Sequence, residues 1–379
     1  MAIDIGEFVS AVRSALDVAG LPDQITEPDR IAVARIMHSD PLGQSAVEEF
    51  EARLGEVCHR RHVIAVSSGT AALHLALLGL GAEPRYYSVA VPAMGFVAAA
   101  NAVLYCGARP EFIDACPVHG GIDMYHPAAP MPCSVIGIDL WGHPGGMERL
   151  ERFCGGVIPL IEDACQALGS SSNGRPCGSF GKISVLSFNV NKIVTTGGGG
   201  AVLTDDGDLA EHVRHLRQQA KDSSQQYRYD YTGVGYNYRM PNICAALGVS
   251  QLGRLRELVA DRRALADAYR GAFEQIGGVS FVDEPDGAVS NCWMPTCRIV
   301  GDLGDHGGTA VWWVRDRILD ALAVAGMPGR AAFTPLPMLP QFRSGLVPQF
   351  RSRLDGRNYP VAVDHYDRTI CLPVRRGVK

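Results

Sequence analysis

Ser184-Val-Leu-Ser-Phe-Asn-Val-Asn-Lys192-Ile-Val-Thr-Thr-Gly-Gly-Gly-Gly-Ala201 is the stretch that decides the fold we expect. Residues 184–188 predict a buried strand, and the apolar run 200–204 predicts a second one. Lys192 therefore lies in a tight connection between two core strands. An amine in apolar surroundings has its charged form disfavoured, which makes it nucleophilic enough for Schiff-base chemistry. The four glycines let backbone approach a bulky ligand. Taken alone, the stretch also fits a surface lysine followed by a flexible glycine hinge.

Seven short apolar runs recur along the chain, and helical or turn stretches separate them. The runs are His62–Val66, Ser88–Val91, Glu111–Asp114, Ser134–Asp139, Val157–Glu162, Ile183–Phe188 and Gly200–Thr204. This alternation is typical of an α/β layer around a mostly parallel sheet. Ligands of such sheets gather at the carboxyl ends of the strands. We therefore expect the functional site at that edge of the sheet.

Three of these strand ends carry side chains that together suit one cofactor. The segment Ser67–Thr70 precedes a helix-forming run, so it offers hydroxyls and backbone N–H groups to an anion, or serves as an ordinary helix cap. Asp163 ends an apolar run and can pair with a buried cationic nitrogen or cap a helix. Lys192 is the third. Because a pyridoxal phosphate enzyme needs a phosphate anchor, an acidic partner and a Schiff-base lysine, the sequence predicts that cofactor.

Length and composition indicate a globular protein of more than one lobe. The chain has 379 residues, of which 47% are hydrophobic and 20% charged. We expect a large cofactor-binding domain with an N-terminal helical segment over residues 1–250, and a linking helix with a small C-terminal domain over residues 251–379. A net charge of −5, spread along the chain, predicts no nucleic acid partner and no anionic membrane partner. Walker and dinucleotide glycine fingerprints are absent.

The sequence also bears on location and metals. Residues 1–7 have neither the basic nor the apolar segment of an export signal, and the longest apolar passage, 89–105, is interrupted by proline, glycine and asparagine. We therefore expect a cytoplasmic protein in which the eleven cysteines are reduced thiols. Cys292 and Cys297 lack partner ligands at a zinc-like spacing, so we expect no metal site.

Five motifs follow one another in a fixed order. They are Ser68-Gly-Thr-Ala-Ala-Leu-His74, Glu162-Asp-Ala-Cys-Gln166, Gly178-Ser-Phe-Gly181, the stretch 187–200, and Gly235-Tyr-Asn-Tyr-Arg-Met240. Together they resemble the DegT/DnrJ/EryC1/StrS family of sugar aminotransferases, most of all the enzymes that aminate C4 of nucleotide-linked 4-keto-6-deoxy sugars, of the bacillosamine and perosamine type. The resemblance implies an α/β fold of the pyridoxal phosphate-dependent transferase type I, similar to aspartate aminotransferase, with a seven-stranded, mostly parallel sheet and a smaller C-terminal α/β lobe.

The resemblance also assigns roles to residues. Lys192 would form the Schiff base and shuttle a proton, Asp163 would pair with the pyridinium nitrogen, and Gln166 would lie near the ring hydroxyl. The other cofactor residues that it implies are Gly69, Thr70 and Ser187 at the phosphate, Phe96 stacked on the ring, and Asn237 reaching the phosphate from the neighbouring subunit. A homodimer with shared active sites is thereby implied. The residues implied at the substrate are Arg239, Trp293 and Arg330.

The activity implied is that of an aminotransferase of amino sugar biosynthesis, of the EC 2.6.1 type. It would move an amino group from glutamate, glutamine or a similar donor to a keto sugar. The alternatives are an enzyme of a natural-product pathway with an aminocyclitol or non-sugar substrate, a dehydratase, and a non-catalytic regulatory protein; dehydratase relatives carry histidine at the position of Lys192. Asp139 and Pro337 stand at positions where members of the family that the chain resembles commonly have histidine. The acceptor, its nucleotide, the carbon aminated and the stereochemistry stay open.

Overall fold

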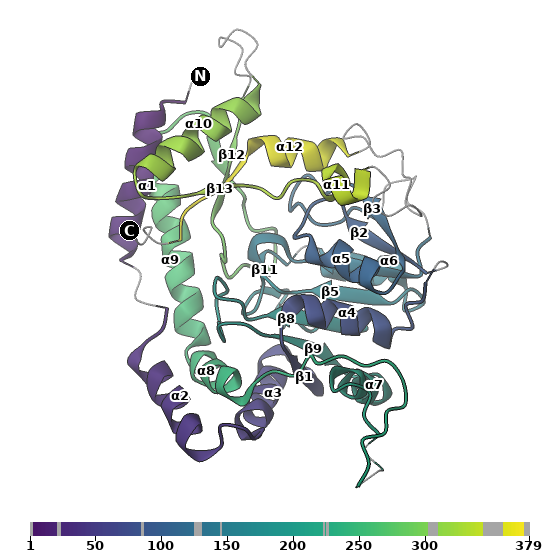
Figure 1. Ribbon diagram of the computed structural model, residues 1–379. Helices are drawn as coiled ribbons and strands as arrows, with labels where there is room; N and C mark the ends of the chain where they lie inside the picture. Colours follow the sequence, from purple (N-terminus) through teal and green to yellow (C-terminus); the bar gives the residue numbers. More distant parts are fainter. Residues whose placement is uncertain are drawn as a thin grey trace.

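The computed structural model describes residues 3–20, 24–84, 87–124, 131–144, 146–222, 224, 227–301, 310–343 and 359–374. A seven-stranded sheet forms its centre, in the strand order β1-β9-β8-β5-β4-β2-β3 (Figure 1). The strands are β1 (His62–Val66), β2 (Ser88–Pro92), β3 (Arg109–Ile113), β4 (Ser134–Ile138), β5 (Leu160–Asp163), β8 (Ile183–Ser187) and β9 (Gly200–Thr204). Only β9 runs against its neighbours, β1 and β8. The prediction of a seven-stranded, mostly parallel sheet is confirmed.

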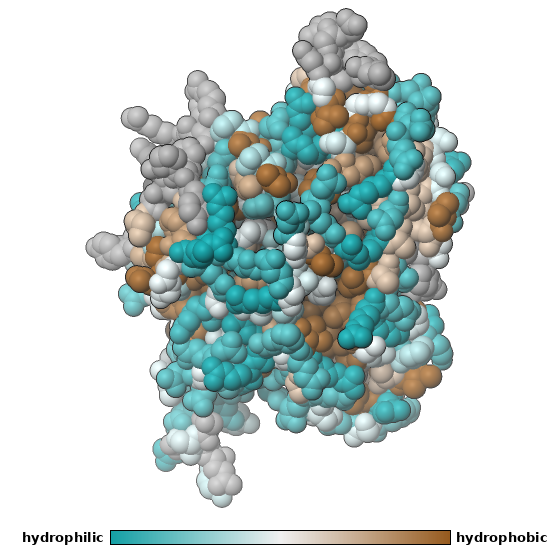
Figure 2. Space-filling model, turned by 180° about the vertical axis from the view of Figure 1, so that it is seen from behind, coloured by the Kyte–Doolittle hydropathy of each residue, from teal (hydrophilic) through white to brown (hydrophobic). Residues whose placement is uncertain are grey.

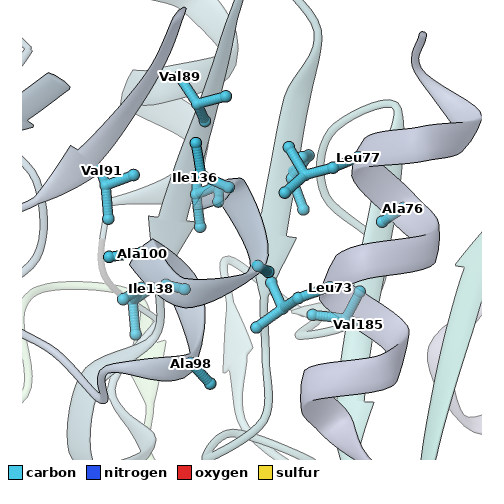
Figure 3. Packing of buried hydrophobic residues seen from close by; sticks show 14 of the residues in the cluster. Leu73, Ala76, Leu77, Val89, Val91, Ala98, Ala100, Ile136, Ile138 and Val185 are labelled. Atoms are coloured by element: carbon cyan, nitrogen blue, oxygen red, sulfur yellow. The ribbon is translucent and has the colours of Figure 1, made fainter. Parts of the chain in front are cut away.

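Helices cover both faces of this sheet because alternate strand residues point to opposite sides. One face packs on α4 (Gly69–Gly79), α5 (Ala98–Tyr105) and α7 (Gly207–Arg217). Figure 3 shows leucines of α4 and alanines of α5 against valines and isoleucines of β2, β4 and β8. The other face packs on α3 (Ser45–Cys58), α6 (Met147–Cys154) and α8 (Asn242–Leu252). The strand residues are therefore apolar on both sides, as the near-continuous apolar runs require.

A second, antiparallel sheet belongs to the C-terminal part of the chain. Its order is β10-β12-β14-β13, formed by Val279–Phe281, Thr296–Ile299, Thr369–Cys371 and Arg330–Ala331. The helices beside it are α1 (Ile5–Ala19), α9 (Leu255–Phe273), α10 (Val311–Val324) and α12 (Pro360–Arg368). Figure 1 shows α1, the first helix of the chain, lying along α9. The smaller α/β lobe is thus present and holds the N-terminal helix; the division at residue 250 stays a prediction.

The remaining elements are α2, which packs on α8, and several short elements, of which β11, β6 and β7 form a third small sheet. They are α2 (Glu27–Ser39), β6 (Ser171–Ser172), β7 (Arg175–Pro176), β11 (Ala288–Val289), α11 (Pro340–Arg343) and the 3-10 turns Leu140–Gly142 and Leu336–Met338. In the part of the chain that the structure describes, no helix combines the length and the apolar character needed to cross a membrane.

One expected element differs. The apolar residues of 245–273 recur at helical spacing and predict a single linking helix, but α8 ends at Leu252 and α9 begins at Leu255. Gly253 has a low helix propensity, and Arg254 leaves helical backbone angles, with φ −111° and ψ 13°. The Arg254 guanidinium binds the buried Asp29 carboxylate of α2 at 2.9 Å. The break therefore coincides with an ion pair between segments distant in sequence, which a local pattern cannot indicate.

Candidate active site

A pocket of about 490 Å³ opens at the carboxyl ends of β1, β5 and β8, the edge at which a ligand was expected. It is lined by Lys192 and by all the predicted cofactor residues except Asn237, and also by Trp293 and Arg330. Its volume lies within the usual range for small-molecule sites. The structure therefore gathers residues from six separate regions of the sequence around one cavity.

The N-terminus of α4 forms one end of this pocket. Ser68 is the N-cap, and its hydroxyl accepts a hydrogen bond from the backbone N–H of Ala71 at 3.0 Å. Gly69 and Thr70 make up the first turn beside it. Unpaired N–H groups and the helix dipole both favour an anion there. A side chain at Gly69 would come within 2.8 Å of the Ser187 side chain, so glycine is needed where α4 meets β8.

The start of β9 presses on the same turn. A Cβ atom on Gly200 would lie 2.5 Å from the carbonyl carbon of Ser68 and 2.7 Å from the backbone nitrogen of Gly69. Because both contacts are with backbone, the turn itself would have to move.

We expect Gly200→Ala to lower the free energy of unfolding by about 1–3 kcal/mol and to weaken cofactor binding. Chemical denaturation of the cofactor-free protein measures the first effect, and equilibrium titration with the cofactor measures the second. Gly198→Ala is the stability control, since a Cβ there meets nothing within 4 Å. Equal stability of Gly200→Ala and the parent protein would show that the turn yields without cost.

Asp163 is the last residue of β5, and Gln166 lies on the segment that follows it. The Asp163 carboxylate accepts a hydrogen bond from the backbone N–H of Cys165 at 3.1 Å, and burial raises the pKa of this carboxyl while the nearby Lys192 ammonium lowers it. The Gln166 side-chain oxygen accepts from the backbone N–H of Trp141 at 2.8 Å. A buried carboxylate of this kind favours a cationic partner in the pocket, because a positive charge offsets the cost of its burial.

Lys192 lies in the connection between β8 and β9, as the sequence predicted. Its backbone carbonyl accepts a hydrogen bond from the Gln24 side chain at 2.8 Å, and the Gln251 side chain accepts one from the backbone N–H of Thr195 at 2.9 Å. Gln24 lies just before α2 and Gln251 lies in α8, so the loop is held from these two segments. Burial is the largest influence on the pKa of Lys192 and lowers it; Arg330 acts in the same direction, whereas Cys165 and Asp163 raise it.

The wall opposite β8 comes from the C-terminal part of the chain. The Lys192 Nζ atom lies 4.2 Å from the centre of the Trp293 ring. The Arg330 guanidinium lies 6.0 Å from the same ring and 4.6 Å from the ring of Phe333. The Phe96 ring, 54% exposed, is 6.1 Å from Phe333. Aromatic faces and two cations thus share this side of the pocket.

Beneath the site, Asp139, Glu162 and Cys177 are buried and place possible ligand atoms within 4.8 Å of one another. The Glu162 carboxylate accepts hydrogen bonds from the backbone N–H groups of Gly178 at 2.7 Å and Phe180 at 2.8 Å. Burial raises the pKa of Glu162 to about 7. These hydrogen bonds give Glu162 a structural role, in which it holds the loop after β7 against β5.

Two predicted residues do not enter the pocket. Asn237 and Arg239 are exposed, and their segment runs beside the end of β1, where the Tyr238 carbonyl accepts a hydrogen bond from the Ser67 N–H at 2.8 Å. They therefore lie next to the phosphate end of the site but outside its lining.

The sequence predicted no role for several residues of the site. Phe333 and Asn191 line the pocket, and the Asn291 side chain donates to the carbonyl oxygens of Gln166 at 3.0 Å and Leu168 at 2.9 Å. Asn291 is buried, which a polar side chain tolerates when its hydrogen bonds are made. No periodic pattern marks these three residues, because each lies in irregular chain.

The chain is similar to known aminotransferases in both sequence and structure. A family model described as the DegT/DnrJ/EryC1/StrS aminotransferase family matches residues 23–379. The chain is 35% identical over 303 residues to the GDP-perosamine synthase of Caulobacter vibrioides, covering 78% of each protein. It is 33% identical over 259 residues to a UDP-4-amino-4,6-dideoxy-N-acetyl-beta-L-altrosamine transaminase of Campylobacter jejuni, covering 66% of this chain and 68% of that one. The crystal structure of the aminotransferase TlmJ from Streptoalloteichus hindustanus, 28% identical, superposes with a TM-score of 0.80 over 92% of this chain and 91% of that chain.

Proposed function

The chain belongs to the DegT/DnrJ/EryC1/StrS aminotransferase family, and on that premise we propose that it transfers an amino group from an amino acid to a keto sugar with pyridoxal phosphate as cofactor. The observation that carries the proposal is the meeting of Lys192, Asp163 and the N-terminus of α4 around one pocket. The match to the family model confirms the family expected from the sequence, and the similarity to solved aminotransferase structures confirms the fold class.

The residues present fit this cofactor. Pyridoxal phosphate supplies a reactive carbonyl carbon and an electron-withdrawing ring, and leaves anchoring and proton transfer to the protein. Gly69, Thr70 and Ser187 would hold the phosphate at the α4 N-terminus, where the helix dipole and hydroxyls favour an anion. Asp163 would hold the ring nitrogen in its protonated form, since the buried carboxylate favours a positive partner. Gln166 would lie near the ring hydroxyl, and Phe96 would stack on the ring.

Lys192 would perform the covalent and proton-transfer chemistry. Its amine is shielded enough for its pKa to be lowered, so a larger fraction is neutral and nucleophilic. When the amino donor takes its place, the Nζ atom would be free to accept a proton from the donor's α-carbon and to deliver it to the reactive carbon of the cofactor. A lysine at this position also argues against a dehydratase, whose relatives carry histidine there.

For the acceptor we propose a nucleotide-linked 4-keto-6-deoxy hexose, and for the donor glutamate or glutamine. The names of two relatives, a GDP-perosamine synthase and a UDP-linked 4-amino-4,6-dideoxy sugar transaminase, support the first choice. Arg330 and Trp293 in the pocket wall, and Arg239 at its edge, are the residues that we assign to substrate binding. Asp139 is buried beneath the site, so its departure from histidine changes the support of the pocket and not its surface.

We further propose a homodimer in which Asn237 reaches the phosphate of the neighbouring active site. Asn237 is exposed and lies beside the phosphate end of its own pocket without lining it, which leaves its side chain free to contact another subunit. The cytoplasmic location rests on the sequence and stays a prediction.

The acceptor is tested by isotope transfer. Protein loaded with pyridoxal phosphate is incubated with nitrogen-15 glutamate and, separately, with GDP-, UDP- and dTDP-linked 4-keto-6-deoxy hexoses. Mass spectrometry of the products should show an amino sugar that carries the heavy nitrogen with one nucleotide. Omission of the keto sugar is the control. In a parallel incubation with a keto cyclitol, a labelled aminocyclitol together with no labelled nucleotide sugar would replace the proposed acceptor but keep the aminotransferase.

A further inference from the structure

The Trp293 ring provides a surface for the lysine amine inside the pocket. Only 3% of the residue is exposed, and the Lys192 Nζ atom lies 4.2 Å from its ring centre. A cation within about 6 Å of an aromatic face is attracted to it, and tryptophan gives the strongest attraction of the aromatic side chains. Since the contact is shielded from water, its contribution is larger than that of an exposed pair.

Hydrogen bonds on two sides fix the position of this ring. The indole N–H donates to the backbone carbonyl of Asn191 at 2.7 Å, one residue before the lysine. The backbone N–H of Trp293 donates to the Asn291 side chain at 2.8 Å, and Asn291 in turn donates to the carbonyl of Gln166 at 3.0 Å. The ring is therefore tied both to the lysine loop and to the segment that carries Asp163.

The face of an aromatic ring suits an amine that is covalently bonded at one stage of the reaction and free at another. Asp163 attracts the ammonium through its negative charge, whereas the indole attracts it without a net charge. In transamination the lysine amine is bonded during one stage and free during another, and when free it alternates between neutral and protonated forms. A site that holds the free ammonium close, without an ion pair, keeps the amine oriented for its next step.

We propose that Trp293 is a positioning residue whose indole face seats the Lys192 ammonium whenever that amine is not bonded to cofactor or substrate. The proposal rests on the proposed function, because it assigns the seat to the free stage of the lysine. It differs from a substrate-binding role for Trp293, since it concerns the protein's own amine and is measurable in the absence of any substrate.

If the Trp293 ring binds the Lys192 ammonium, substitutions of Trp293 should change the pKa of Lys192 in a predictable order. Trp293→Phe keeps a smaller aromatic face, and Trp293→Leu keeps an apolar side chain without a face; both lose the indole N–H, so the pair isolates the effect of the face. Removing the face destabilises the ammonium relative to the neutral amine. The pKa of Lys192 should therefore fall from the parent protein to Trp293→Phe and again to Trp293→Leu, by about 0.5–1 pH unit in all, a threefold to tenfold change in the acid dissociation constant.

The measurement is the rate at which cofactor-free protein binds pyridoxal phosphate covalently, followed by visible absorption over a range of pH. No donor or acceptor is added, so catalytic turnover does not enter. The ionisations of the cofactor are common to all variants and cancel in the comparison. Borohydride reduction and peptide mapping confirm the site of attachment, since the chain has only four lysines, at positions 182, 192, 221 and 379.

Trp313→Leu is the matched control, because Trp313 also faces a cation, Arg317 at 5.5 Å, but lies 47% exposed on α10. It should leave the pH midpoint unchanged. Below the midpoint the Trp293→Leu protein should bind the cofactor faster than the parent, the reverse of what damage to the pocket would cause. If the pH midpoint of cofactor binding is unchanged or raised in Trp293→Leu and Trp293→Phe, the positioning role of Trp293 is contradicted while the proposed function stands. Failure of the parent protein itself to bind the cofactor overturns both.

Discussion

Lys192→Ala abolishes amino transfer, lowering its rate by about a thousandfold or more, because both the covalent bond to the cofactor and the proton carrier are lost. Lys192→Arg should be equally inactive, although it keeps a positive charge over Trp293 and beside Asp163, since a guanidinium stays protonated and does not act as the nucleophile. The measurement is the rate of transfer from labelled glutamate to the acceptor at saturating cofactor.

Two other lysines provide controls for this result. Lys182 is paired with Asp206 at 2.5 Å on the surface, and Lys221 lies over the exposed ring of Tyr229 at 4.6 Å. Lys182→Ala and Lys221→Ala should transfer amino groups at the parent rate. Borohydride reduction of the loaded parent protein should attach the cofactor to the peptide that contains Lys192. Attachment at another lysine, or turnover in Lys192→Ala, would remove the assigned role.

Asp163→Asn should slow the donor-dependent half-reaction by about a hundredfold to a thousandfold. The substitution keeps the size of the side chain and removes the negative charge that offsets a protonated ring nitrogen. The backbone N–H of Cys165 can still be bound by the amide oxygen, so the segment after β5 should stay in place. Stopped-flow absorption after mixing loaded protein with glutamate measures the rate.

The control for this charge effect is Asp206→Asn. Asp206 also follows a strand of the same sheet, but its carboxylate caps α7 through the N–H of Leu209 at 3.1 Å, far from the pocket lining. Asparagine is an equally good N-cap, and the ion pair with Lys182 that is lost lies at the surface and contributes little, so stability should change little and the rate should be kept. A rate for Asp163→Asn within a factor of three of the parent would show that the ring nitrogen needs no charged partner here.

Most of the large sheet could be predicted from the sequence because most of its strands are short, local apolar runs. The positions of Asp163 and Lys192 followed from this pattern, since a parallel sheet brings the carboxyl ends of its strands to one edge. The resemblance to a known family added Phe96, Trp293 and Arg330, which local chemistry alone did not single out.

What the sequence could not provide were contacts between irregular segments. Asn291 binds the carbonyls of Gln166 and Leu168 from more than a hundred residues away, and nothing in its neighbourhood predicts this. The break between α8 and α9 likewise coincides with a pairing between Arg254 and the distant Asp29. Asn237 stays outside the pocket, so its proposed role depends on a second subunit, which one chain's sequence cannot place.

The central claim is that Lys192 and the pocket around it catalyse amino transfer. A visible absorption spectrum tests this claim most directly. The purified protein is mixed with pyridoxal phosphate, and visible absorption is recorded before and after addition of glutamate or glutamine, with no acceptor present. We predict the band of a lysine-bound cofactor, and its conversion on addition of a donor to the spectrum of the aminated cofactor. A band that neither donor changes would contradict transamination from these donors, and the absence of any band would contradict the catalytic role of Lys192.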